Sequence, residues 1–163
     1  MSRSTRFRSA LLPVALVLTA LAGSALAAED PAVAAEVMAA TKAQWAAQDQ
    51  NKPGAQSYTT VADDYTEFNP VVPVLVKGKD MSVRMFDASL KAGTQGLSSE
   101  MVNPHVQVYG DTAILTYNYA GMTKSTDGEV TPNLAKSTRV YVRQGGKWML
   151  VHANFAPVTV PGS

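Results

Sequence analysis

The chain contains no cysteine and only two histidines, His105 and His152. The lack of thiols excludes disulfides, zinc–thiolate sites and cysteine nucleophiles, so the fold must be stabilised by packing. Two histidines are too few for a histidine-rich metal site, and no loop has the ligand spacing of a calcium site. The sequence therefore predicts no metal and no other cofactor.

The chain also lacks a long apolar run. The longest, Leu11–Ala22, is too short to cross a bilayer of ~30 Å, which needs about 20 residues. Three arginines precede it, and an Ala25-x-Ala27 sequence follows, which is the order of a secretory signal peptide. We therefore expect residues 1–27 to be removed and residues 28–163 to form one domain. The mature protein is predicted to be periplasmic or secreted, with no membrane attachment.

A strong charge of one sign is absent as well. The predicted leader holds three of the 14 basic residues and none of the 13 acidic ones, so the rest of the chain has eleven basic residues against thirteen acidic ones. Nucleic-acid binding depends on clustered Lys and Arg side chains against phosphates. The sequence therefore predicts no nucleic-acid partner.

The first element after the leader has the pattern of an amphipathic helix. Asp30 and Pro31 are typical of an N-cap and a first helical residue. The residues expected on the buried face recur every fourth position: Val33, Val37, Thr41 and Trp45. This spacing predicts one helix that ends near Gln50.

The next segment has mixed signals. A short helix is predicted over 55–62 and a strand over 65–68. The apolar run 71–76 contains a proline, which fits either an edge strand or an ordered loop. Asp80 is predicted to cap a third helix that ends at Gly93.

From Ser98 onward the hydrophobic period changes from that of a helix to that of a strand. Four strands are predicted, at 101–109, 113–122, 137–143 and 147–155. A tight turn at Gly110-Asp111 would pair Val106 with Leu115. Helices followed by a long antiparallel meander predict an α+β fold.

Several short segments together resemble a known family. They are Asn103-Pro104-His105, Gly110-Asp111, Asp127-Gly128, Ser137-Thr138-Arg139-Val140 and Gly146-Lys147-Trp148-Met149-Leu150-Val151-His152. In order and spacing they are similar to the association domain of calcium/calmodulin-dependent protein kinase II, within the nuclear transport factor 2-like, or SnoaL-like, superfamily. The resemblance implies a cone: about three N-terminal helices packed in the concave face of a strongly curved antiparallel sheet, around a pocket.

The same resemblance implies self-association, as a homodimer or a larger ring. It does not imply a kinase, because the sequence has no glycine-rich nucleotide loop, no His-Arg-Asp loop and no Asp-Phe-Gly motif. We therefore expect a non-catalytic, self-associating binding module.

The resemblance also implies a pocket with one cation. Arg139 matches a pocket arginine of the kinase domain, whereas Tyr119 and Phe155 stand where that pocket has further cations and Ser82 stands where it has a histidine. Asn154 also replaces a common histidine. A single guanidinium can pair with a carboxylate, so the expected ligand is a small, partly apolar carboxylate. The alternative is a strand arginine that extends into solvent or pairs with an acidic neighbour.

Other candidates for the pocket are Tyr65, Tyr117 and His152. A structural role is the plainer interpretation of Tyr117, since aromatic residues that alternate on a strand usually pack in a core. A tight turn before the last strand would place His152 beside Arg139, whereas the family comparison places Phe155 there. Because one residue of slip moves every side chain to the other face, the sequence leaves both registers open.

The alternative function is an isomerase or cyclase that uses a pocket carboxylate or histidine as a general base. The candidate bases are Asp63, Asp64 and His152, with Glu67 in the same strand and Tyr65 as a hydrogen-bond donor. The plainer interpretation of Asp63-Asp64 is a solvated turn that leads into a strand.

Overall fold

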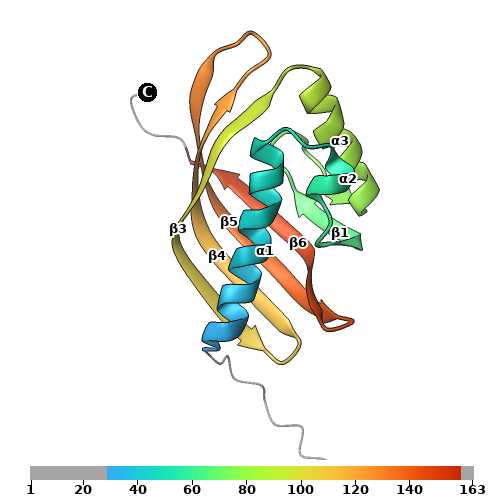
Figure 1. Cartoon of the computed structure of the whole chain (residues 1–163), viewed down its shortest axis with the longest axis vertical. Coiled ribbons are helices and arrows are strands. Elements are labelled where there is room, and N and C mark those ends of the chain that lie inside the picture. The colour runs from blue at the N-terminus through green and yellow to red at the C-terminus, as the bar shows by residue number, and fades with distance from the viewer. Residues whose placement is uncertain (1–28, 159–163) are drawn as a thin grey trace, which may run out of the picture.

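The computed structural model describes residues 29–158, in which the helices lie against one face of a curved sheet (Figure 1). The predicted signal peptide, residues 1–27, lies outside the described residues. Within 29–158 no helix has both the length and the apolar character needed to cross a membrane.

The elements in chain order are α1 (Pro31–Asp49), α2 (Gly54–Ser57), β1 (Val61–Phe68), β2 (Val76–Lys77), α3 (Lys79–Lys91), β3 (Gln95–Tyr109), β4 (Thr112–Lys124), β5 (Val130–Gln144) and β6 (Lys147–Pro157). The six strands are ordered β2-β1-β6-β5-β4-β3. All neighbours are antiparallel except β1 and β6, which run parallel. The predicted α+β fold, with helices packed against a curved and open sheet, is confirmed.

Helix α1 begins as the sequence predicts. The Asp30 carboxylate accepts hydrogen bonds from the backbone N–H groups of Ala32 and Val33, and Pro31 is the first helical residue. These contacts satisfy two of the N–H groups that a helix N-terminus leaves without partners. The predicted buried face is confirmed, and Gln44 is buried with it.

The two other helices differ from their predictions. The helix expected over 55–62 ends at Ser57, and β1 already begins at Val61. The β-branched residues at 59–61 favour the extended backbone, which explains the early end. In α3 the N-cap is Gly78, with φ of 85°, rather than Asp80. Asp80 lies in the first turn instead, where its negative charge still stabilises the helix dipole.

The β3–β4 hairpin has the predicted register. Tyr109 pairs with Thr112 and Val106 pairs with Leu115 across the tight turn. Leu115 is fully buried, as are Leu150 of β6 and Tyr141 of β5. The Tyr141 hydroxyl and Thr41 Oγ1 are 2.6 Å apart, a hydrogen bond that joins α1 to the concave face of the sheet.

Strand β6 contains an irregularity that decides which side chains face inward. Tyr141 pairs with Leu150, but the next pair is Val140 with His152, so one residue of β6 is skipped. Burial accordingly changes from the even positions, Trp148 and Leu150, to the odd position Ala153. A bulge of this kind reverses the faces of all residues that follow it.

Candidate functional site

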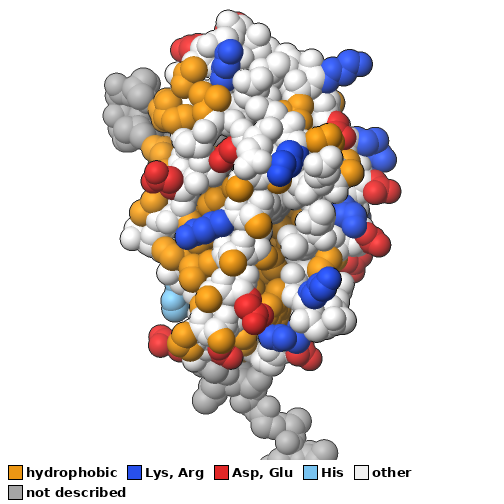
Figure 2. All heavy atoms as spheres, in the orientation of Figure 1, with side chains coloured by type: hydrophobic (Ala, Val, Ile, Leu, Met, Phe, Trp, Pro, Cys, Tyr) orange, Lys and Arg blue, Asp and Glu red, His pale blue; other side chains and the backbone are white. Residues whose placement is uncertain are grey.

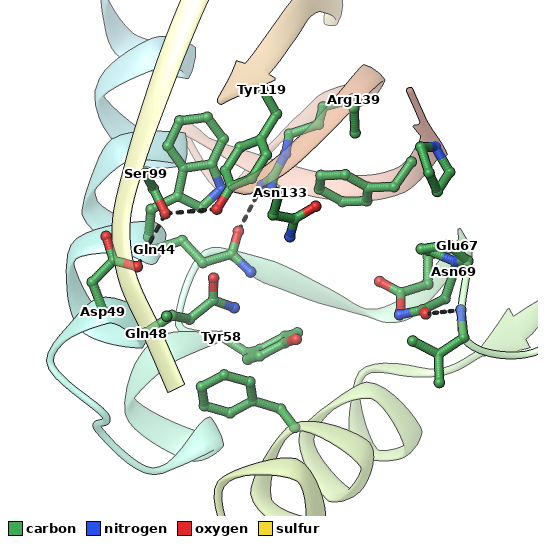
Figure 3. A pocket seen from close by; sticks show the side chains of 18 of the residues that line it. Gln44, Gln48, Asp49, Tyr58, Glu67, Asn69, Ser99, Tyr119, Asn133 and Arg139 are labelled. Atoms are coloured by element: carbon green, nitrogen blue, oxygen red, sulfur yellow. Dashed lines mark hydrogen bonds between the residues drawn. The ribbon is translucent and has the colours of Figure 1, made fainter. Parts of the chain in front are cut away.

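A cavity of about 300 Å³ lies between the helices and the concave face of the sheet. Figure 3 shows Gln44, Gln48 and Asp49 on the α1 side, Arg139 and Asn133 on the sheet side, and Glu67 with Asn69 at one end. Aromatic side chains from several elements form much of the wall: Trp45, Tyr58, Tyr65, Phe86, Tyr119 and Phe155. Small-molecule sites typically combine such apolar walls with a few polar groups.

Arg139, at the centre of β5, is the cation of this cavity. Only 3% of it is exposed. Its Nε donates to the Tyr117 hydroxyl at 2.9 Å, and its Nη1 donates to Gln44 Oε1 at 2.7 Å. The guanidinium carbon lies 5.6 Å from the centre of the Trp45 ring and 5.5 Å from that of Phe155. Two aromatic rings therefore flank the guanidinium, which favours the charge and restricts its orientation.

Among the described residues, 29–158, no carboxylate pairs with Arg139. The ion pairs within residues 29–158 are Lys79–Asp63 and Arg143–Glu36. The two hydrogen bonds of Arg139 use two of the five donors that a guanidinium has. Burial by itself would lower the pKa of Arg139, but the surrounding oxygens of Tyr117 and Tyr141 hold this pKa above its ordinary value. The cavity thus contains a charged donor that is only partly used.

Glu67 brings an acidic group to the same cavity from β1. It is 7% exposed, and both of its oxygens have a partner. The Tyr65 hydroxyl donates to Oε2 at 2.7 Å, and Asn69 Nδ2 donates to Oε1 at 2.9 Å. The Asn69 side chain is itself held by the N–H of Val71. Glu67 is therefore a buried carboxylate supported by neutral donors.

Two tyrosines near Glu67 are held in their neutral form. Burial, followed by the charge of Glu67, raises the pKa of both Tyr58 and Tyr65 well above the ordinary value. Each hydroxyl therefore remains a hydrogen-bond donor throughout the physiological pH range. Burial also raises the pKa of Tyr119, at the other end of the cavity.

A polar cluster closes the end opposite Glu67. Ser99 Oγ donates to Asp49 at 3.0 Å and lies 3.0 Å from the Tyr119 hydroxyl. Gly121 is needed here, because a Cβ at this position would lie too close to the Tyr119 hydroxyl and 2.6 Å from the Ser98 carbonyl oxygen. The cluster joins α1 to β3 and β4 at the rim (Figure 3).

A smaller pocket of about 200 Å³, termed the annex, adjoins the Glu67 end of the cavity. The two spaces share Tyr58, Glu67, Asn69, Val71 and Phe86. α3 adds Ser82, whose side-chain oxygen is buried and has no hydrogen-bond partner within residues 29–158. The annex therefore has one charged and one unpaired polar group.

Four residues predicted for the pocket line the cavity. They are Arg139, Tyr119, Phe155 and Tyr65. Tyr117 lies behind Arg139 and holds its Nε, so its contribution is to position the guanidinium. Whether these residues bind a ligand stays a prediction.

His152 and Asn154 do not line the cavity. The bulge in β6 pairs Arg139 with Ala153, so neither of the two expected registers is correct. Phe155 nevertheless contacts the guanidinium diagonally, while His152 Nδ1 lies 2.9 Å from Thr66 Oγ1. Asn154 lines a separate groove with Thr138 and Asn103.

The predicted bases Asp63 and Asp64 are exposed and also lie outside the cavity. Asp63 is paired with Lys79 at 2.6 Å. Alternation along β1 explains the exposure of Asp64, since Tyr65 and Glu67 share the inward face. Asp63 would share that face by alternation alone, but it lies where the pairing of β1 with β6 is irregular, between Val61 and Thr66. Of the acidic residues considered in this strand, only Glu67 reaches the cavity.

Gln44 was not predicted as a cavity residue, and Glu67 was named only as a residue in the same strand as the candidate bases. Both could have been found from spacing. Gln44 lies seven residues after Val37 and therefore on the same face of α1. Glu67 lies two residues after Tyr65 and thus on the same face of β1.

No metal site is formed by the described part of the chain. Within residues 29–158 there is no group of three or more His, Cys, Asp or Glu side chains that could hold a metal ion. The face seen in Figure 2 has basic and acidic side chains intermixed, with hydrophobic side chains between them. This face presents no continuous basic surface.

The chain is similar in sequence to a subunit of a known protein kinase. The δ subunit of calcium/calmodulin-dependent protein kinase type II from Oryctolagus cuniculus is 33% identical over 101 residues, which are 60% of this chain and 19% of the kinase subunit. The chain therefore spans about a fifth of the length of that relative.

Two solved structures extend the comparison. The hub homology domain of the kinase from Chlamydomonas reinhardtii has a TM-score of 0.63 and 26% identity, and the match covers 78% of this chain and 98% of that one. A nuclear transport factor 2-like superfamily protein from Salmonella enterica serovar Typhimurium has a TM-score of 0.68 and 13% identity, with coverages of 80% and 94%. The second likeness shows the fold alone.

The family assignment rests on most of the chain. Residues 33–158 match the calcium/calmodulin dependent protein kinase II association domain. This range includes all of the helices except the first two residues of α1, the whole sheet and the whole of the cavity. The chain belongs to the calcium/calmodulin-dependent protein kinase II association domain family.

Proposed function

We propose that the protein is an exported, non-catalytic, self-associating binding module whose cavity takes a small, partly apolar carboxylate. The observation that carries this proposal is the buried guanidinium of Arg139, which has no carboxylate partner within residues 29–158. An unpaired buried charge is costly to a fold, whereas a bidentate carboxylate would satisfy it.

The walls of the cavity support a ligand with an apolar part. Trp45 and Phe155 flank the guanidinium, and Tyr58 and Phe86 lie elsewhere on the wall, with ring centres 6.0 Å apart. Apolar surface buried in such a site contributes about 25 cal/mol for each Å². A carboxylate with a short hydrocarbon chain thus fits both the charge and the walls.

Self-association follows from the family, whose association domains form oligomeric hubs. Kinase activity is not proposed, because the match covers 19% of the kinase subunit and the sequence lacks kinase motifs. Export rests on the leader pattern of residues 1–27. Mass spectrometry of the protein from periplasm and medium tests export, with an N-terminus at Ala28 as the expected result.

The binding proposal is tested by calorimetry with pentanoate and with 1-pentanol as the uncharged comparison. Pentanoate is expected to bind and pentanol to bind more weakly. An Arg139→Gln variant should lose pentanoate affinity by about 10- to 100-fold, since a hydrogen bond to a charged group contributes about 1.5–3 kcal/mol. Light scattering on the same samples should give a mass of at least a dimer.

Arg143→Gln is the matched control. Arg143 is on the same strand, is exposed, and lies over the Trp148 ring outside the cavity. This variant should bind pentanoate as the unaltered protein does. Equal loss in both variants, or no pentanoate binding by the folded protein, would contradict the proposal.

A second candidate function is favoured by Glu67. A buried carboxylate beside a neutral tyrosine hydroxyl is a suitable pair for moving a proton next to a carbonyl group. This candidate predicts that the protein accelerates conversion of cyclohex-3-enone to the conjugated isomer, followed by ultraviolet absorbance. Glu67→Gln should abolish the acceleration and Asp64→Asn should not; absence of acceleration by the unaltered protein removes this candidate.

A further inference from the structure

We propose that the natural ligand is a zwitterion, with a carboxylate at Arg139 and a cationic amine at Glu67 in the annex. This inference rests on the proposed binding function and names its ligand class more narrowly. It arises because one continuous wall carries two buried charges of opposite sign. The two charges are not paired with each other in the described residues.

The free hydrogen-bonding capacity of Glu67 is the first step. An ionised carboxylate has about four acceptor positions. Tyr65 and Asn69 occupy two of them, one on each oxygen. Both partners are neutral donors, and within residues 29–158 no cation forms an ion pair with Glu67. The carboxylate can therefore accept further hydrogen bonds, and a cation is the partner that would best satisfy it.

The annex supplies what an ammonium group requires besides the carboxylate. The Ser82 side-chain oxygen lines the annex, and the residue is 2% exposed with that oxygen unpaired. The rings of Tyr58 and Phe86 border the same space, and aromatic faces attract cations. An ammonium has three N–H donors, which the Glu67 carboxylate and the Ser82 hydroxyl can accept.

Charge balance decides against a simple carboxylate as the preferred ligand. A monocarboxylate would neutralise Arg139 but would leave Glu67 unpaired and add a further negative charge to a cavity that Glu67 and Asp49 already line. A simple amine would leave Arg139 unpaired in the same way. A zwitterion satisfies both charges at once, so the cavity should discriminate against molecules that carry one charge only.

The test compares three probes on the unaltered protein by calorimetry: 5-aminopentanoate, pentanoate and pentylamine. The amino acid is expected to bind at least about tenfold more tightly than either of the other two, which corresponds to about 1.4 kcal/mol. 6-Aminohexanoate extends the test to a longer separation of the charges. If pentanoate binds as tightly as both amino acids, the zwitterion inference fails while the carboxylate-binding function stands. If none of the probes binds, both fail.

Variants test which residue of the cavity binds each charged group of the ligand. Glu67→Gln should remove the advantage of the amino acid and leave pentanoate affinity unchanged or higher, whereas Arg139→Gln should weaken both. Ser82→Ala should weaken the amino acid alone, by less than Glu67→Gln does. Asp64→Asn, an exposed carboxylate on the same strand, is the matched control and should change nothing. An advantage that survives Glu67→Gln in a folded protein overturns the inference.

Discussion

The two charged ends of the cavity are built in different ways. Arg139 is held by partners that lie 22 and 95 residues away in the chain, on β4 and α1. Glu67 is held by partners only two residues away on either side. Arg139 is in the middle of a four-strand antiparallel meander, whereas Glu67 is near the end of β1, which pairs with the two-residue edge strand β2.

This difference teaches how each charge is kept in place. The position of Arg139 depends on the packing of α1 against the meander, so it changes if that packing loosens. The position of Glu67 depends on the local alternation of β1 and on the asparagine that follows it. The position of Arg139 should therefore respond more to substitutions far away in the chain than the position of Glu67 does.

The largest effect is expected from a substitution in the meander. Leu115→Ala should lower the free energy of unfolding by about 2–5 kcal/mol, because it leaves a cavity behind a fully buried side chain. Urea unfolding followed by circular dichroism measures this. Leu97→Ala is the control, since Leu97 is 46% exposed in β3, and it should change stability by less than about 0.5 kcal/mol. Equal losses of stability in the two variants would contradict the view that packing within the meander holds Arg139 in place.

Alkaline pH should lower the stability of the protein through the two tyrosines near Glu67. The pKa values of Tyr58 and Tyr65 are raised in the folded protein by burial and by Glu67. Below about pH 10 these hydroxyls are protonated in both states, so they cause no pH dependence. Above it the unfolded chain loses its protons first, and stability should fall by about 1.4 kcal/mol per pH unit for each of the two tyrosines.

Urea unfolding at a series of pH values from neutral to alkaline measures this slope. Tyr65→Phe is the comparison, and it should reduce the slope by the share of one tyrosine. An identical slope in this variant would show that Tyr65 ionises normally and is not held neutral beside Glu67.

The smallest effect concerns the start of α1. Asp30→Ala removes the carboxylate that accepts hydrogen bonds from the N–H groups of Ala32 and Val33. The variant should lower the free energy of unfolding by about 1 kcal/mol. Because α1 also carries Gln44, pentanoate affinity at the Arg139 end should weaken slightly. Asp30→Ser keeps a capping oxygen and should retain most of the stability. Loss of affinity at the Glu67 end alone would contradict the division between the two ends.

Much of the fold follows from patterns of short range. The cap at Asp30, the buried face of α1 and the register of the β3–β4 hairpin were all predictable, because each depends on residues close together in the chain. The extent of the second helix was predicted wrongly because β-branched residues at 59–61 outweighed a weak helical pattern.

The candidate site was predictable only in part. Resemblance to a family pointed to Arg139, Tyr119 and Phe155, which line the cavity. The alternation of β1 alone indicated that Tyr65 and Glu67 share a face. This was overlooked because Asp63-Asp64 was interpreted as a solvated turn. The exclusion of His152 and Asn154 could not be predicted, since no turn residue or proline marks the bulge in β6.

The sequence by itself determined helix α1 with its buried face, the β3–β4 hairpin with its register, and the α+β fold class, because these depend on periodicity and local backbone preference. Only the tertiary structure decided that Arg139 and Glu67 share one cavity and that Phe155 rather than His152 contacts the guanidinium. The physical reason is that parallel pairing of β1 with β6 and a single skipped residue in β6 are long-range events. They bring together side chains whose separation in the sequence does not indicate that they lie close to one another.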